Sequence, residues 1–291
     1  MLTVNAEDLI DQMNLADRRL SKGHQRLARY LADHYDSAAH LTASALGEAA
    51  GVSESTVVRF AVAMGYEGYP EFQQAFQELV RHRLTANQRF QMSTEMKKED
   101  VLATVLKADM RNIRSTVEHL DNSAFLDAVN RIQRAKAIYV LGLRSAAPLA
   151  QFLGYYLNFI FDNVHIVASG VTDVFEGIVR VDQDDVLIAI SFPRYSNRTV
   201  EAMRFAKRSG AQVIALTDGA MSPLFETSDV CLAASTDMAS FVDSLAAPLS
   251  VINALLVALG LQKGEALKNH LEQLEGLWTE HSVYTGQEHR G

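Results

Sequence analysis

The chain has 291 residues, more than the roughly 100–200 of a usual single domain, so two cores are expected. Its formal net charge of −8 argues against a nonspecific polyanion binder, because affinity for phosphates comes mainly from Lys and Arg. The single cysteine, Cys231, excludes an internal disulfide and a thiolate-rich metal site.

No targeting or membrane segment is evident. The start of the chain carries acids instead of a basic segment, and no apolar run approaches the roughly 20 residues that span a bilayer. The histidines show no spacing suited to a metal site. We therefore expect a cytoplasmic protein without membrane contact, metal or cofactor.

Residues 1–84 indicate helices separated by short turns. Ser21 is placed to cap a helix in which Leu27, Leu31 and Tyr35 recur at intervals of four. The polar stretch 85–100 suits a linker or a solvated helical connector. A second domain is expected over 101–291. It opens with a helical stripe that we expect to pack on that domain: Val101, Val105, Leu106, Ile113, Val117 and Leu120.

Residues 41–65 carry the steric pattern of a helix-turn-helix. Gly51 stands where the chain must turn sharply and φ is positive, Val52 fills the angle between the helices, and Ser53 is placed to cap the second helix. The core-facing positions of that second helix follow helical spacing. They are Val57, Phe60, Ala61 and Met64.

The opposite face of the second helix is then free to contact base edges in the major groove of double-stranded DNA. Arg59 can pair with a guanine or hold a phosphate, and Ser53 or Ser55 can donate to phosphate oxygens. An ordinary helical hairpin is the alternative. The predicted DNA-binding residues are Ser53, Glu54, Ser55, Val58 and Arg59.

From about residue 135, short apolar runs alternate with helical stretches, which is typical of βαβ units. We expect five parallel strands in a three-layer αβα domain. A long apolar helix over about 238–261, which is either core or an interface, and a polar helix or tail over 263–280 follow. The expected strands are Ala137 to Leu141, Val164 to Ala168, Val186 to Ser191, Gln212 to Thr217 and Asp229 to Ala233.

Two loops at strand ends carry anion-binding chemistry. Gly142 allows a tight turn after the first strand, and Pro148 suits the first turn of the next helix. The free N–H groups there, with the Arg144 guanidinium and the Ser145 hydroxyl, can bind a phosphate. The missing partner glycines argue against a dinucleotide site.

The loop after the third strand repeats this chemistry. Hydroxyls and arginines gather there, in the region where open α/β sheets bind ligands. An exposed polar loop is the alternative. The candidate ligand-binding residues of this loop are Ser191, Arg194, Ser196, Arg198 and Thr199.

Residues 41–72, with Arg59-Phe60 and the Gly65-Tyr66 break, resemble the helix-turn-helix domain of the RpiR/MurR family of regulators. Residues 137–261 resemble the sugar isomerase (SIS) domain that follows it in this family. The resemblance implies phosphosugar binding, with Ser145, Ser191 and Thr199 at the phosphate-binding positions. Leu143 and Arg144 stand where the family has its second glycine and the residue after it. The second loop is longer than in the family, lacks its glycine and gains Arg194 and Arg198.

The sequence therefore predicts a transcription regulator, not an enzyme, whose operator binding is modulated by a small anionic metabolite, a phosphosugar or sugar acid. The added arginines favour a carboxylate or a doubly charged acid phosphate. Self-association to a homodimer or homotetramer is expected. The alternative is an aldose–ketose phosphosugar isomerase, which needs a positioned general base. Its candidates, His165, Glu176 and Glu201, are interpreted as structural.

Overall fold

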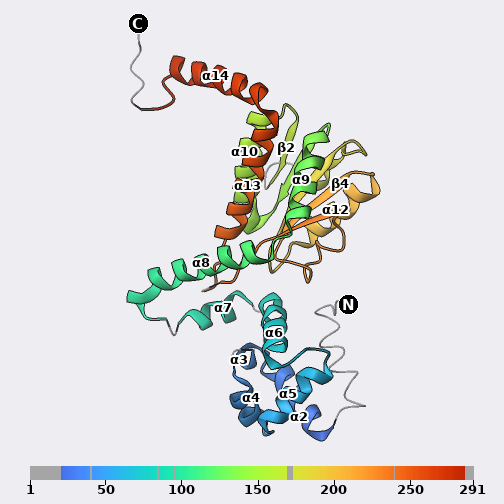
Figure 1. The fold of residues 1–291 in the computed structure, drawn as a ribbon, viewed down its shortest axis with the longest axis vertical. Helices are drawn as coiled ribbons and strands as arrows, with labels where there is room; N and C mark the ends of the chain where they lie inside the picture. Colours follow the sequence, from blue (N-terminus) through green and yellow to red (C-terminus); the bar gives the residue numbers. More distant parts are fainter. Residues whose placement is uncertain are drawn as a thin grey trace. The chain divides into compact units, whose positions relative to one another are not determined.

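A computed structural model describes residues 21–39, 41–83, 85–94, 96–168, 173–238 and 240–285. The chain divides into two compact units, Met1–Glu95 and Met96–Gly291. The described part of the first unit is helical, and the second is an α/β unit (Figure 1).

The first unit packs around aromatic side chains. Phe60 and Phe72 meet edge to face with ring centroids 5.7 Å apart, and Phe72 stacks on Phe76 at 5.7 Å. The hydroxyl of Ser21 accepts from the backbone N–H of His24 at 3.3 Å, which confirms the predicted cap. The helices are α2 (Lys22–Asp33), α3 (Tyr35–Ala38), α4 (Ala43–Ala50), α5 (Glu54–Ala63), α6 (Tyr69–Arg83) and α7 (Ala86–Ser93).

The polar stretch 85–100 contains α7, which begins at a reciprocal capping box between Thr85 and Gln88. The side-chain amide of Gln88 also donates to the hydroxyl of Tyr35 at 3.1 Å, which attaches α7 to the first unit. The one-turn helix η1 (Lys98–Asp100) then leads into the second unit.

The second unit contains a five-stranded, fully parallel sheet with the order β2-β1-β3-β4-β5. Each strand falls within or one residue from an apolar run that the sequence predicted. The inner strands β1, β3 and β4 are largely apolar because both of their faces are buried, whereas two residues of the edge strand β2 are exposed. The strands are β1 (Ile138–Gly142), β2 (Val164–Val167), β3 (Val186–Ile190), β4 (Gln212–Thr217) and β5 (Val230–Ala233).

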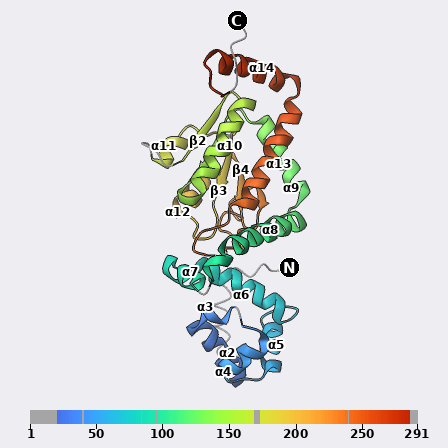
Figure 2. The same ribbon diagram turned by 90° about the vertical axis from the view of Figure 1, so that its left-hand side faces the viewer.

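Helices cover both faces of this sheet (Figure 2). Alternate strand residues such as Val140 and Ile188 face α9 (Asn122–Arg134), α10 (Ala147–Ile160) and α13 (Ala246–Lys263). The intervening residues, such as Leu141 and Leu187, face α11 (Val174–Ile178) and α12 (Asn197–Arg208). The unit also includes α8 (Val101–His119), η2 (Arg144–Ala146) and α14 (Glu265–Glu280). The architecture is the three-layer αβα arrangement that the sequence predicted.

The long apolar helix α13 is, by length and composition, the one described helix that could cross a bilayer. Its side chains Val251, Ile252 and Leu255 lie in the core against the sheet. On its other side Val257 is 62% and Leu261 is 78% exposed. The helix is therefore part of the core and also presents an apolar outer face.

The face that α8 packs against the second unit differs from the prediction. The expected apolar stripe is largely exposed, with Val117 76% and Leu106 53% accessible, whereas Ala108, Asn112 and Thr116 are buried. Polar bonds hold this buried face. The Asn112 side chain donates to the carbonyl of Asp237 at 2.8 Å and accepts from its N–H at 3.0 Å.

Further bonds attach α8, among them one from the Ser235 hydroxyl to the Ser115 hydroxyl at 2.9 Å. Thr116 Oγ1 accepts from the N–H of Ser235 at 2.9 Å, and the Ser244 hydroxyl donates to Asp109 at 2.6 Å. The segment after β5 carries backbone groups without strand partners, and unpaired polar groups are costly when buried. Hydrogen bonding to this backbone therefore decides which face of α8 packs.

We predict that Asn112→Ala lowers the free energy of unfolding by about 1–3 kcal/mol, since it leaves two backbone groups of Asp237 without their partner. Urea denaturation followed by circular dichroism measures this change. Arg111→Ala, on the exposed side of the same helix, serves as the control and should change stability by under about 0.5 kcal/mol. Equal effects of the two substitutions would contradict the assigned role of Asn112.

Candidate functional site

The turn between α4 and α5 has the backbone geometry that the sequence predicted. Gly51 ends α4 in the left-handed conformation with φ of 67°. Its carbonyl accepts a bond from the Arg26 guanidinium at 2.9 Å, which ties α2 to the turn. Through this contact, α2 helps to fix the angle between α4 and α5.

Ser53 occupies the N-cap position of α5, but its hydroxyl makes no capping bond, so that part of the prediction was wrong. The Ser53 hydroxyl instead lies 2.9 Å from the hydroxyls of Ser55 and Thr56. The first N–H groups of α5 consequently have no side-chain cap, and such groups can donate to a DNA phosphate.

The outer face of α5 is exposed where the sequence predicted it. Val57, Phe60 and Ala61 are fully buried, whereas Val58 is 39% exposed. Ser53, Glu54, Ser55 and Arg59 are also exposed. The Arg59 Nε donates to the carbonyl of Ser55 at 3.1 Å, which orients the guanidinium while using only one of its nitrogens.

A basic stripe on α2 was missed from the sequence. Lys22, Arg26 and Arg29 are exposed at i, i+4 and i+7, so they share one helix face, and Arg26 lies at the turn before α5. This spacing was a readable signal. His24 packs edge to face on Phe60 at 5.6 Å, and burial and then the charge of Arg59 lower its pKa.

The two predicted anion-binding loops leave neighbouring strands. Gly142, the last residue of β1, pairs with Ile190, the last residue of β3. Strand order reverses between these two strands, which is where open α/β sheets form a ligand crevice. The topology therefore brings the loop that begins at Leu143 beside the loop that begins at Ser191.

Gly142 is required by the close approach of the following helix. A Cβ atom there would lie 2.7 Å from both the carbonyl oxygen of Ala146 and the Cβ of Ala150. Pro148 is the second residue of α10 and so lies in its first turn, as predicted. Arg144 and Ser145 lie between, in η2, and both are exposed.

Arg144 and Arg194 both adopt left-handed backbone conformations, with φ of 56° and 68°. Residues other than glycine rarely do so, and the strain costs about 1–2 kcal/mol per residue. Both side chains are exposed, and neither makes a hydrogen bond or ion pair with the residues that the structure describes. Each loop thus presents a guanidinium from a strained backbone position.

The hydroxyls of the second loop lie deeper. Ser191 is 6% exposed, and its oxygen is 3.5 Å from the N–H of Ser196. Thr199, in the first turn of α12, is fully buried, and its hydroxyl has no hydrogen-bond partner among the described residues. The N-cap residue Ser196 provides no side-chain cap, so the N-terminus of α12 retains uncapped donors.

Arg198 has a structural partner that the sequence did not predict. Its guanidinium forms an ion pair with Asp173, whose other oxygen accepts from the N–H of Phe175 at 3.0 Å and caps α11. The Phe175 bond and then the Arg198 bond lower the pKa of Asp173. Arg198 therefore joins the N-termini of α11 and α12.

Two further residues at this sheet edge were missed. The Tyr195 hydroxyl donates to Asp218 at 2.6 Å, and Thr217, the last residue of β4, donates to the same oxygen at 3.1 Å. They link the second loop to the end of the next strand. Only the fold places residues 23 positions apart together.

The isomerase candidates have structural contacts. Glu176 accepts from the N–H of Asp173 at 3.0 Å in a capping box, and His165 stacks on Tyr139 at 4.7 Å. Glu201 is exposed on α12.

Burial, with the charge of Asp218, raises the pKa of the Cys231 thiol to about 12, which disfavours a thiolate. Within the described residues, no group of three His, Cys, Asp or Glu could hold a metal ion.

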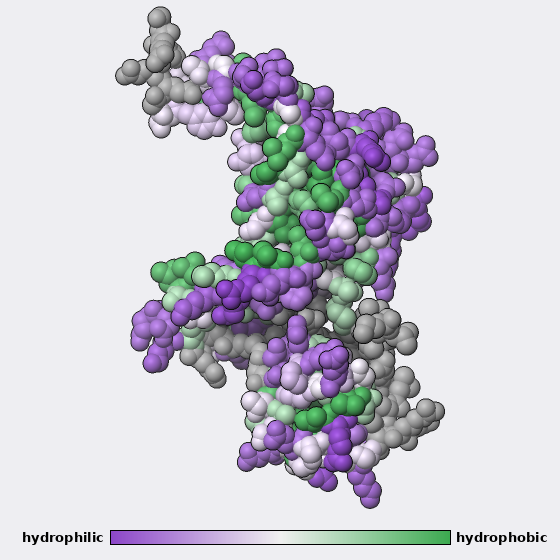
Figure 3. Space-filling view, in the orientation of Figure 1, coloured by the Kyte–Doolittle hydropathy of each residue, from purple (hydrophilic) through white to green (hydrophobic). Residues whose placement is uncertain are grey.

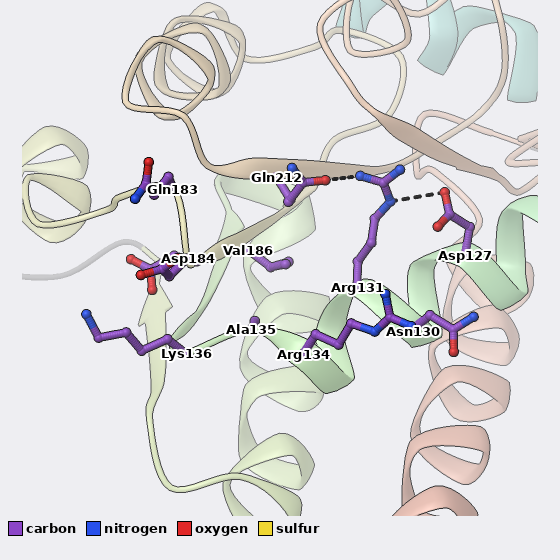
Figure 4. Close-up of a pocket in the computed structure, with 11 residues that line it drawn as sticks. Asp127, Asn130, Arg131, Arg134, Ala135, Lys136, Gln183, Asp184, Val186 and Gln212 are labelled. Carbon is purple, nitrogen blue, oxygen red and sulfur yellow. Dashed lines mark hydrogen bonds and ion pairs between the residues drawn. The ribbon is translucent and has the colours of Figure 1, made fainter.

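A cavity of about 620 Å³ lies at the opposite edge of the sheet, where β3 and β4 begin. In Figure 4, Arg131 spans this cavity between Asp127 and Gln212. Asp184 and Asp185 add negative charge to its lining. Its three basic residues are balanced by three aspartates, so the cavity has no excess of positive charge for an anion; these residues are Arg131, Arg134 and Lys136, and Asp127, Asp184 and Asp185.

Comparisons with known proteins match both units. Residues 7–81 match the helix-turn-helix domain of the rpiR family, and residues 131–258 match the SIS domain. The transcriptional regulator HexR of Pseudomonas aeruginosa is 26% identical over 92% of this chain and 95% of its own length. HexR of Escherichia coli is also 26% identical, over 92% of this chain and 93% of its own length.

Solved structures show the same fold. The sugar isomerase domain of an RpiR transcription factor from Sphaerobacter thermophilus matches 60% of this chain and 98% of its own, with 27% identity and a TM-score of 0.58. NanR of Vibrio vulnificus, solved with ManNAc-6P, matches 96% of this chain and 100% of its own, with 19% identity and a TM-score of 0.58.

We predict that Gly142→Ala lowers the free energy of unfolding by about 1–3 kcal/mol, because the new methyl group overlaps two atoms of the following helix. Gly276→Ala is the matched control. A Cβ on Gly276, inside the exposed helix α14, meets nothing within 4 Å, so it should stabilise by up to about 1 kcal/mol. Chemical denaturation of both variants checks the opposite signs; a stabilising Gly142→Ala would refute the close approach.

Proposed function

The chain belongs to the RpiR family of transcriptional regulators, and from this membership we propose that it binds an operator through α5. A small anionic metabolite, which is a phosphosugar or a sugar acid, controls that binding. The protein acts in the cytoplasm on double-stranded DNA. The metabolite binds beside the loops after β1 and β3, at the carboxyl ends of these two neighbouring strands.

One observation carries the effector site: two loops rich in anion donors meet at the point where strand order reverses. The buried, unpartnered hydroxyl of Thr199 and the uncapped N-terminus of α12 supply donors for a phosphate. Ser191 and Ser145 contribute further hydroxyls. That NanR, a protein of the same fold, is solved with the sugar phosphate ManNAc-6P supports this class of effector.

DNA binding rests on local charge. The chain as a whole is acidic, with a net charge of −8. The basic stripe Lys22, Arg26 and Arg29 lies on α2, which is tied to the turn before α5, so it supplies phosphate contacts while Arg59 and Ser55 face the bases. The base specificity of DNA binding then depends on α5, and the affinity for the DNA phosphates depends on α2.

Coupling runs through α8. This helix begins the second unit along the chain, and Asn112 and Thr116 bond it to residues 235–237 beyond the end of β5. The effector loops emerge from the same carboxyl edge of the sheet. A ligand that favours one arrangement of this edge therefore also favours one position of α8.

Self-association supplies the two α5 helices that a palindromic operator requires. Charged residues are absent from residues 145–161 and 244–262, which include α10 and α13, two neighbouring helices on one face of the sheet. Figure 3 shows hydrophobic residues gathered along α13 and α8. The exposed large apolar residues of α8 are Val101, Leu102, Leu106, Met110, Ile113 and Val117.

We assign this apolar face to a second copy of the chain. Each copy carries a net charge of −8, and contact through an uncharged surface places no like charges directly against one another. At 1.5 Å per residue and a helix diameter of roughly 10 Å, α10 and α13 form a strip about 20 Å wide and 20–27 Å long. With α8 added, its area approaches the roughly 800 Å² per partner of a standard interface.

The regulator proposal predicts separable defects. Arg59→Ala should abolish or relax operator binding while effector-induced thermal stabilisation persists. Ser191→Ala should weaken that stabilisation with DNA binding retained. Gel shifts on the DNA upstream of the protein's own gene, titrated with sugar phosphates and sugar acids, measure the first property, and thermal denaturation measures the second. Arg111→Ala, on the exposed charged side of α8, is the control.

The absence of any sequence-specific shift at modest salt would contradict the regulator proposal. Isomerase turnover on the same compounds would support the enzyme alternative instead. Equal loss of both properties in either variant would indicate misfolding and would leave that residue's assignment without support.

The assembly proposal predicts a mass of at least twice 32.1 kDa by light scattering for the unsubstituted chain. Val257→Glu introduces a charge at the centre of the apolar face and should shift the protein to the monomer mass. Arg111→Glu, a charge reversal on the exposed charged side of α8, should keep the assembled mass. A monomeric parent chain, or no effect of Val257→Glu, would contradict the assigned interface.

A further inference from the structure

We propose that Val58 and Val62 of α5 read the operator by packing on the C5-methyl groups of thymines in the major groove. The inference rests on the proposed function, since α5 must first enter the groove. It adds Val62 to the residues that contact DNA and states which base these two side chains recognise.

The outward face of α5 is formed by four residues with the spacing i, i+3, i+4 and i+7, which places them on one side of a helix. These exposed residues are Ser55, Val58, Arg59 and Val62. Val62 is 54% and Val58 is 39% exposed, whereas the opposite side of α5 is buried in the core of the first unit. Both valines therefore lie where a recognition helix meets base edges.

The exposure of these two valines is unfavourable for the chain alone. Valine is a poorer helix former than alanine because its branched Cβ loses rotamer freedom, and an exposed valine gains nothing from burial. Among residues 21–83 whose side chains the structure describes, Val58 and Val62 are the only large apolar side chains that are exposed. They lie one helical turn apart and so form a single apolar spot. An apolar group of a binding partner would cover it.

Thymine supplies a matching group. Its C5-methyl is the apolar group that base edges present in the major groove, beside their hydrogen-bond donors and acceptors. Four residues of an α-helix advance about 6 Å, whereas one base-pair step advances about 3.4 Å. Where α5 follows the groove, the two valines consequently reach thymines about two steps apart.

The surroundings of the valines favour DNA as the group that covers them. Arg59 lies on the same face, and its Nε donates to the carbonyl of Ser55 at 3.1 Å. The two terminal nitrogens of Arg59 can then pair with a guanine. Arg26, from the basic stripe on α2, reaches the turn that precedes α5. A polyanion that carries methyl groups on its base edges complements both this positive charge and the apolar spot.

Deoxyuridine is the direct probe, because it differs from thymidine only by the missing C5-methyl group. Selection of random duplexes on the full chain provides a binding site. This site is then synthesised with one thymine position at a time replaced by deoxyuridine in both half-sites, and gel shifts give each Kd. We expect at least two positions at which the replacement weakens binding about 5- to 50-fold, as for two buried methyl groups.

Val58→Ala and Val62→Ala should each weaken binding to the thymine duplex by a similar factor. Each should have no effect on the duplex that carries deoxyuridine at its own position, since the methyl contact is already absent there. Alanine is the better helix former, so the Tm of neither variant should fall. Val179→Ala, at a 64% exposed valine after α11, is the matched control and should change neither Kd.

Deoxyuridine duplexes that bind as tightly as the thymine duplex, or valine variants that weaken binding to both duplexes equally, would overturn this inference and leave the proposed function standing. Valine variants that lose DNA binding together with a fall in mass by light scattering would assign the apolar spot to a contact between two copies, which also overturns it. A selection that enriches no sequence would overturn the operator proposal as well.

Discussion

The parallel, in-register pairing of β1 with β3 is the constraint on which the remaining argument depends. It sets Gly142 against Ile190, so that two loops about fifty residues apart in sequence leave the sheet side by side. Parallel strands need crossovers on the sheet faces, which is why α10 and α12 begin directly after these loops. The same geometry that covers the sheet with helices thereby aligns two helix N-termini and two arginines at one edge.

The helix α8 is attached at this same carboxyl edge of the sheet, to the residues that follow β5. Asn112 bonds to both backbone groups of Asp237, and Thr116 bonds to Ser235, so the first long helix of the second unit is held by polar contacts of defined direction. Apolar packing tolerates small sliding movements, whereas hydrogen bonds of this kind hold one register. The apolar side chains left outside are then available to a second copy of the chain.

The sequence predicted the features that depend on local pattern. Short apolar runs marked all five strands, including the partly exposed edge strand β2, and helical spacing separated Val57 and Phe60 from Val58 and Arg59. It failed where a tertiary polar contact prevails. The packed face of α8 and the Arg198–Asp173 pair depend on groups that only the fold brings together, whereas the Ser53 hydroxyl bonds to its sequence neighbours Ser55 and Thr56. The basic stripe on α2 was readable and was missed.

In this account, DNA and effector bind to the same conformational equilibrium with different preferences. Thermodynamic linkage then requires each ligand to change the affinity for the other by the same factor. The most direct test is to measure the Kd of the effector by calorimetry with and without saturating operator DNA. The account predicts that operator changes the effector Kd by the same factor by which effector changes the operator Kd. An effector Kd that is unchanged by bound operator, for an effector that does shift the operator Kd, would contradict it.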